Sequence, residues 1–145
     1  MEKITVAIHS FGNIGRYALE AVQASPDFHC VGVIRRPESV GKDAYSLCGV
    51  KDYPGLDALL AAEEKPQIIL VASPSRKVPV DAAYYLEKGF HTVDSFDIHS
   101  EIPEVVGKLH ESCLKGKAVS ITAAGWDPGT DSVFRAYFEA MAPVG

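Results

Sequence analysis

The sequence is poor in the features that mark secreted, metal-binding and membrane proteins. Its 145 residues include three cysteines, Cys30, Cys48 and Cys113, which are odd in number and lack the close spacing of a metal site. No apolar run approaches the ~20 residues that a membrane span needs, and no basic segment followed by an apolar leader opens the chain. We therefore expect reduced thiols, no metal ion, no membrane partner and a cytoplasmic location.

An excess of basic residues is also missing. Lys and Arg number 14 against 19 Asp and Glu, which gives a formal net charge of -5. Because nucleic-acid binding requires a basic face, this balance argues against a nucleic-acid partner. Hydrophobic residues make up 47% and charged residues 23% of the chain, as in ordinary globular proteins. The length suits one domain over residues 1–145.

Apolar segments of strand length alternate with segments of helical periodicity. Strands are expected at residues 4–8, 30–34, around 50, 68–72, 91–94 and 118–121. Helical patterns cover residues 14–22, 56–60, 79–88, 105–114 and 133–141, and residues 37–46 are expected to form a loop. Gly89 is expected to end one helix in a left-handed conformation and Ser100 to cap the next. The alternation predicts an α/β fold, a Rossmann-type doubly wound parallel sheet of about six strands with helices on both faces.

The turn after the first strand resembles a dinucleotide fingerprint. It reads Ser10-Phe11-Gly12-Asn13-Ile14-Gly15. Gly12 and Gly15 take the places of the glycines that let the backbone approach a pyrophosphate and let the helix pack close to the strand. Ser10 replaces the first glycine, at a cost on the order of 1 kcal/mol if its φ is positive; at a negative φ its hydroxyl could add a donor. We expect residues 11–15 to bind phosphate, the alternative being a plain strand-to-helix turn.

The tip of the second strand predicts which dinucleotide is bound. NAD-binding domains place Asp or Glu there, ~20 residues beyond the glycines, to hold the ribose 2′-hydroxyl. Here Ile34 is followed by Arg35 and Arg36. Because a guanidinium offers a bidentate fork to a 2′-phosphate, we expect these arginines to favour NADP(H) over NAD(H). The alternative is two solvated arginines at a strand end.

Three later loops leave the carboxyl ends of strands, where ligands of such sheets bind. They contain Ser73-Pro74-Ser75, Asp94-Ser95-Phe96-Asp97 and Gly125-Trp126-Asp127-Pro128-Gly129. These stretches, with residues 12–16 and 75–79, resemble the meso-diaminopimelate D-dehydrogenases over essentially the whole chain. The resemblance implies NADPH-linked, reversible oxidative deamination of meso-2,6-diaminopimelate at its D-centre to L-2-amino-6-oxopimelate and ammonia, a step in lysine biosynthesis.

The resemblance also assigns roles to residues of these loops. Asp97 and Asp127 match the residues that hold the D-amino group, and two carboxylates near one point can orient an ammonium for hydride transfer. Trp126 would wall the substrate pocket. Cofactor contacts are expected from the loop residues Ser73, Pro74, Ser75, Asp94, Ser95 and Phe96. His99 is expected either to partner Asp97 or to mark the entry of a helix.

The chain departs from this family at Ser10 and at its length. Family members continue through a substrate-binding and dimerisation domain, so a homodimer is expected of the full-length enzyme. Inactivity of the 145-residue chain alone is one of the expected outcomes. Two alternatives remain open. One is a nucleotide-binding or interaction module without catalysis. The other is a different NADP-linked oxidoreductase of the same fold, such as a dihydrodipicolinate-reductase-like or opine-type enzyme.

Overall fold

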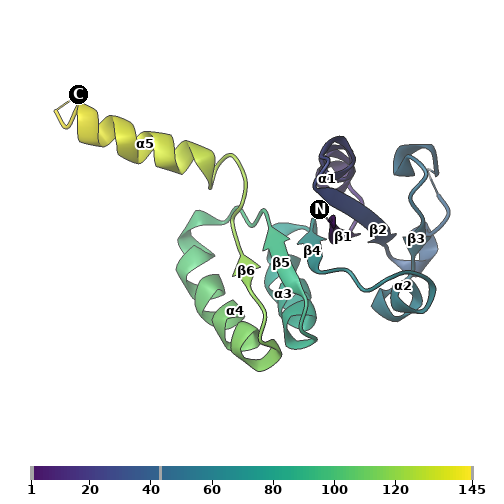
Figure 1. Ribbon diagram of the computed structural model, residues 1–145. Coiled ribbons are helices and arrows are strands. Elements are labelled where there is room, and N and C mark those ends of the chain that lie inside the picture. Colours follow the sequence, from purple (N-terminus) through teal and green to yellow (C-terminus); the bar gives the residue numbers. More distant parts are fainter. Residues whose placement is uncertain (1, 43, 145) are drawn as a thin grey trace.

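The sheet is the centre of the fold. The structure, a computed structural model, describes residues 2–42 and 44–144. Its six strands run parallel in the order β3-β2-β1-β4-β5-β6 (Figure 1). They are β1 (Ile4–His9), β2 (Phe28–Ile34), β3 (Asp52–Tyr53), β4 (Ile68–Val71), β5 (His91–Asp94) and β6 (Ser120–Ile121). This order confirms the predicted Rossmann-type architecture.

Helices connect successive strands, as parallel pairing requires. The α-helices are α1 (Asn13–Ala24), α2 (Leu56–Ala62), α3 (Val78–Glu87), α4 (Ile102–Gly116) and α5 (Thr130–Met141). Short 3₁₀ turns are η1 (Pro37–Ser39), η2 (Ala44–Leu47), η3 (Ser75–Lys77) and η4 (His99–Glu101). The crevice of such a sheet opens where the strand order reverses, here between β1 and β4.

Each face of the sheet has its own hydrophobic core. Val6 and Ile8 of β1 pack in a cluster with Leu19 of α1, whereas Ala7 between them belongs to the cluster that holds side chains of α2, α3 and α4. Successive side chains of a strand point to opposite faces. β1 is therefore buried on both sides, which explains why its sequence is almost continuously apolar.

Local expectations were met in part. Gly89 has the predicted left-handed conformation, with φ +82°. The expected cap at Ser100 is wrong, because that residue lies inside η4 and α4 begins after Glu101. Pro103 sets helical φ in the first turn of α4 and lacks the N–H that a cap would satisfy. The third strand begins at Asp52, just beyond the expected position, and the segment expected to be a loop contains η1 and the start of η2.

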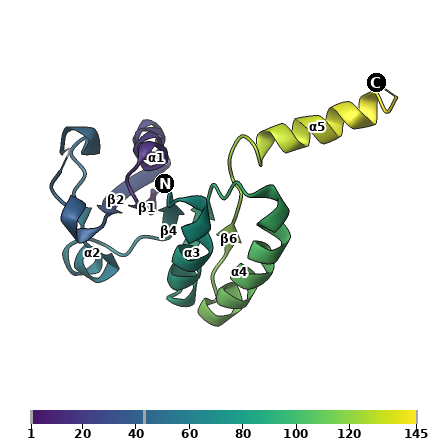
Figure 2. The same ribbon diagram turned by 180° about the vertical axis from the view of Figure 1, so that it is seen from behind.

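Helix α5 extends away from the rest of the domain (Figures 1 and 2). Every residue of it is at least partly exposed. Its exposed apolar side chains recur at three- and four-residue spacing: Val133, Phe134, Tyr137, Phe138 and Met141. Such a stripe is typical of a helix that packs against another element. No helix in the described residues is long and apolar enough to cross a bilayer.

Candidate functional site

Two adjoining pockets lie along the carboxyl ends of the strands. Their volumes are about 720 and 690 Å³, and Ser10, Gly12, Ser73 and Pro74 border both. The first extends to the tip of β2 and to α3, and the second extends to the loops after β5 and β6. A dinucleotide crosses a doubly wound sheet along this line. The crevice therefore offers one pocket to each half of such a ligand.

The glycine turn has the geometry that phosphate binding needs. A Cβ atom added at Gly15 would lie 2.3 Å from the carbonyl oxygen of Ser10, so α1 can approach β1 this closely only with glycine at that position. An atom added at Gly12 would meet nothing within 4 Å. The N–H groups of the first helical turn have no partner within the helix, and no side chain among the described residues caps α1. An anion can bind there.

Ser10 adopts a conformation that glycine normally takes. Its φ is +74°, in the left-handed region, where an L-residue with a Cβ costs roughly 1–2 kcal/mol. We predict that Ser10→Gly raises the free energy of unfolding by about 1 kcal/mol, since the relieved strain exceeds the added entropy of the unfolded chain. Urea denaturation followed by circular dichroism measures the change.

A second serine provides the matched control for that substitution. Ser25 follows α1 with φ -89°, which every residue adopts without strain. Ser25→Gly should therefore lower the stability by about 0.5–1 kcal/mol, through the unfolded state and through the exposed hydrogen bond from the Asp27 N–H that is lost. If both variants lose stability equally, Ser10 carries no strain in solution.

The two arginines at the tip of β2 differ in their surroundings. The Arg35 side chain is only 9% exposed, and its Nη1 lies 3.1 Å from Oδ2 of Asp52 in β3. Its guanidinium also stacks over Phe11, 5.3 Å from the ring centre. Arg36 is 79% exposed and lies 3.4 Å from Glu38. The alternative of two solvated arginines is thus wrong for Arg35, although both residues border the first pocket.

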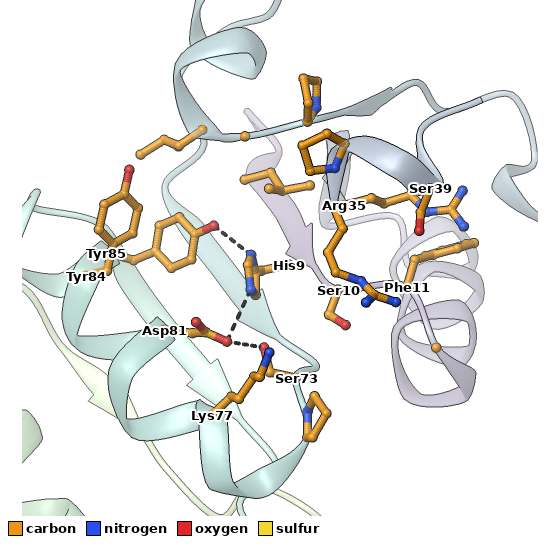
Figure 3. Close-up of a pocket in the computed structure, with 18 residues that line it drawn as sticks. His9, Ser10, Phe11, Arg35, Ser39, Ser73, Lys77, Asp81, Tyr84 and Tyr85 are labelled. Atoms are coloured by element: carbon orange, nitrogen blue, oxygen red, sulfur yellow. Dashed lines mark hydrogen bonds and ion pairs between the residues drawn. The ribbon is translucent and has the colours of Figure 1, made fainter. Parts of the chain in front are cut away.

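A polar network forms the wall of the first pocket opposite these arginines (Figure 3). Nε2 of His9 lies 3.3 Å from Oδ2 of Asp81, and Nδ1 of His9 lies 2.8 Å from the Tyr85 hydroxyl. The Ser73 hydroxyl donates to the same Asp81 oxygen at 2.5 Å. Of these residues, sequence analysis placed only Ser73 in the site. The sequence did offer a signal for His9, because it is a polar residue at the end of an apolar strand, directly before the phosphate turn.

The ionisation of this network follows from its contacts. Burial opposes the charge on Asp81, but hydrogen bonds from His9 and Ser73 and the nearby charge of Lys77 outweigh it and lower the pKa of the carboxyl group. Burial, with smaller contributions from Tyr84 and Asp81, raises the pKa of Tyr85. At neutral pH the network therefore pairs a carboxylate with a neutral phenol.

The second pocket brings together the residues that the family resemblance assigned to the substrate. Asp97 and Asp127 both border it, with Trp126 from the same loop as Asp127. Trp126 is 67% exposed. Ser75 and Ser95 border the same pocket, as do Asn13 and Ile14 of α1. Two carboxylates and an aromatic ring thus flank one space.

Asp94 and Phe96 lie beneath this pocket rather than in its wall. Oδ1 of Asp94 accepts hydrogen bonds from the Phe96 N–H, the Thr122 hydroxyl and the Ala123 N–H, which ties the loops after β5 and β6 together. Phe96 is 1% exposed and belongs to the core. These two side chains support the loop, and a contact of this loop with the cofactor stays a prediction. Ser95, between them in sequence, does border the pocket.

Asp127 is held by a histidine and an arginine side chain. Nε2 of His99 and Nη2 of Arg135 each lie 3.4 Å from its Oδ1. His99 opens η4 at the entry to α4, which confirms that one of its two expected roles, and its ring pairs with Asp127 rather than with Asp97. The backbone of the loop is also constrained, because a Cβ atom at Gly129 would lie 1.9 Å from the Gly125 carbonyl oxygen. The carboxylate of Asp127 is therefore oriented through one oxygen only.

Cysteine and metal chemistry find no support in the described part of the chain. The three cysteines are free, and no group of three or more His, Cys, Asp or Glu among these residues is arranged to hold a metal ion. Burial raises the pKa of Cys30 to about 11, so this thiol stays protonated at neutral pH.

Comparison with known proteins supports the family resemblance. Meso-diaminopimelate D-dehydrogenase of Bacteroides fragilis is 41% identical over 150 residues, across all of this chain and 47% of that protein. The enzyme of the same name from Ureibacillus thermosphaericus is 33% identical, across all of this chain and 44% of that protein. These matches confirm the resemblance inferred from the motifs. The chain spans about half the length of the curated relatives it matches.

Solved structures give the same result for the fold. An engineered D-amino acid dehydrogenase bound to NADP+ matches with a TM-score of 0.81 and 25% identity, over 97% of this chain and 42% of the other. The Corynebacterium glutamicum DAP dehydrogenase in complex with DAP matches with a TM-score of 0.81 and 26% identity over the same shares. Residues 4–93 match the profile described as oxidoreductase family, NAD-binding Rossmann fold. The chain belongs to this oxidoreductase family.

Proposed function

We propose that this chain is the NADP(H)-binding portion of an amino-acid dehydrogenase that deaminates meso-2,6-diaminopimelate at its D-centre. The observation that carries the proposal is the arrangement of the crevice. An arginine pair lies at one end, an open glycine turn in the middle, and Asp97 with Asp127 at the other end. The identity to enzymes of that name supports the choice of substrate.

The residues of the crevice fit NADP(H) from end to end. Arg35 and Arg36 would hold the 2′-phosphate, since a guanidinium has several N–H donors and Arg35 can keep Asp52 as a partner while it binds. The pyrophosphate would lie over Gly12 and the N-terminus of α1. Ser73 to Ser75 and Ser95 would border the nicotinamide, which supplies the hydride acceptor or donor when bound.

The chain's own part in the chemistry is to position the D-amino group. Asp97 and Asp127 attract the substrate ammonium, and their fixed charges favour the iminium that forms as the α-hydrogen leaves. Oδ1 of Asp127 is engaged by His99 and Arg135, so its Oδ2 remains to accept a hydrogen bond from the amine. A carboxylate there can also accept a proton when water attacks the iminium.

The remainder of the enzyme would complete the site. The curated relatives are about twice as long as this chain, and we place the groups that grip the distal end of the substrate in that additional length. The exposed apolar stripe of α5 suits a helix that continues into further structure. A homodimeric, cytoplasmic full-length enzyme is part of the same proposal.

Cofactor preference tests the binding half of the proposal. We predict that the chain binds NADPH more tightly than NADH, and that Arg36→Ala weakens NADPH binding about tenfold, because one charge-assisted contact is lost. NADH binding should change less than about twofold, since NADH lacks the phosphate. Isothermal titration calorimetry, together with Trp126 fluorescence, measures both affinities.

The control for Arg36→Ala removes a remote positive charge. Lys108 lies on α4, where it pairs with Glu104 on the exposed face. Lys108→Ala should leave both affinities unchanged. Equal affinity of the wild-type chain for the two cofactors would contradict the NADP(H) assignment. Turnover of meso-2,6-diaminopimelate by the full-length protein tests the catalytic half, and its absence would favour a binding module.

A further inference from the structure

The wall of the first pocket contains a carboxylate whose position the proposed chemistry does not explain. Asp81 lies on α3, and both of its neighbouring donors, His9 and Ser73, engage the same oxygen, Oδ2. Figure 3 shows these two contacts converging on one side of the carboxylate. The hydrogen bonds of the described residues place no partner on Oδ1. The Asp81 side chain is 25% exposed, so this second oxygen can meet a ligand in the pocket.

The direction of the hydrogen bonds keeps Asp81 an acceptor. An ionised carboxylate only accepts, so Nε2 of His9 carries the proton that faces it. In the neutral imidazole Nδ1 then accepts from the Tyr85 hydroxyl. Tyr85 is buried and packs edge-on against His9 and Phe90, which fixes its ring. The chain of donors from Tyr85 through His9 thus ends at Asp81 and orients it.

The position of Asp81 relative to the arginines indicates what it meets. The 2′-phosphate and the base are attached to the same ribose. If the arginines at the tip of β2 hold the phosphate, the base therefore lies in the same pocket. Across the pocket from the arginines, α3 forms a wall that contains Asp81 and Tyr84. Leu56, at the start of α2, also lines the pocket. A carboxylate on this wall suits the N–H donors on the edge of the base better than it suits the phosphates, whose charge has the same sign.

We propose that Asp81, oriented by His9 and Ser73, recognises the 6-amino group of adenine and so selects adenine over 6-oxopurines. This inference rests on the proposed function, because the base is delivered by the dinucleotide. A 6-amino group offers an N–H donor to the carboxylate. A 6-oxo group instead places an oxygen opposite the carboxylate and repels it, and the neighbouring N1–H can donate to Asp81 only if the base shifts in the pocket.

The test compares NADPH with its hypoxanthine analogue, nicotinamide hypoxanthine dinucleotide phosphate in the reduced form. The two differ only in the 6-substituent and the N1 proton of the base. Calorimetric titration of the wild-type chain should show the analogue binding ten- to a hundredfold more weakly, as expected for one hydrogen bond to a charged group. Equal affinities would overturn the inference but leave the proposed function standing. Binding of neither ligand would overturn both.

Two variants assign the selectivity to this carboxylate. Asp81→Asn should bring the two affinities within about threefold, because an amide both donates and accepts. Asp57→Asn, which removes an exposed carboxylate from the first turn of α2 outside the pocket, should keep the wild-type ratio. A ratio unchanged by Asp81→Asn would place base recognition elsewhere. The wild-type ratio remains decisive even if Asp81→Asn fails to fold.

Discussion

Gly15→Ala should lower the free energy of unfolding by about 3 kcal/mol, the upper range for forcing an atom into a filled space. The added Cβ would lie 2.3 Å from the oxygen and 3.2 Å from the carbon of the Ser10 carbonyl. Both are backbone atoms, so no flexible side chain can move aside. Relief requires α1 to move away from β1, which opens the core that Leu19 shares with Val6 and Ile8. Urea denaturation measures the loss.

Gly12→Ala is the matched variant, three residues earlier in the same turn. Its φ of -87° suits alanine, and its Cβ would meet no protein atom within 4 Å, so stability should change by less than about 0.5 kcal/mol. The methyl group would project into the crevice, where the pyrophosphate must approach the backbone. NADPH affinity should fall at least about tenfold. A Gly12→Ala chain that binds NADPH normally would contradict the phosphate assignment of this turn.

Gly12 and Gly15 show why the fold could be predicted from local sequence. The glycine spacing, the buried strand before it and the helical pattern after it lie within about twenty consecutive residues, and each constrains the others. The alternation of strands and helices then leaves few sheet topologies, because crossover connections are right-handed. These constraints predict the Rossmann-type architecture, which the observed strand order confirms.

The walls of the crevice could be predicted only in part, because they depend on contacts between distant segments. His9 and Tyr85 are 76 positions apart and meet only because β4 lies beside β1 and α3 covers that face. No local pattern indicates this contact. Phe96 illustrates a different limit. It lies in a loop of polar residues, yet it is directed into the core, while its neighbour Ser95 borders the pocket.

Arg35 is predicted from the sequence to hold a phosphate, but nothing in the sequence indicated its partner Asp52. Asp52 lies on β3, paired in register next to β2, and its side chain is as buried as that of Arg35, at 9% exposure. The same carboxylate oxygen also accepts from the Gly41 N–H. A carboxylate therefore lies beside the tip of β2, on the neighbouring strand, and it holds an arginine.

Breaking the ion pair between Arg35 and Asp52 is the second change that we expect to lower the stability strongly. Arg35→Met should lower the free energy of unfolding by about 3 kcal/mol, because the buried carboxylate of Asp52 loses its counter-charge. Asp52→Leu should also lower the stability, because it removes the acceptor of the Arg35 guanidinium and of the Gly41 N–H. The double variant, which replaces both charges with apolar side chains, should recover most of the loss. Urea denaturation of the four proteins gives the coupling energy, and a value near zero would show that the pair adds nothing.

The double variant also separates the two roles of Arg35. Because it restores stability without the guanidinium, any loss of NADPH affinity that remains reports direct binding. We expect about a tenfold loss, similar to that of Arg36→Ala and without effect on NADH, since each arginine contributes a charge-assisted contact to the phosphate. Normal NADPH affinity in the double variant would make Arg35 a structural residue and leave the preference for NADP(H) to Arg36 alone.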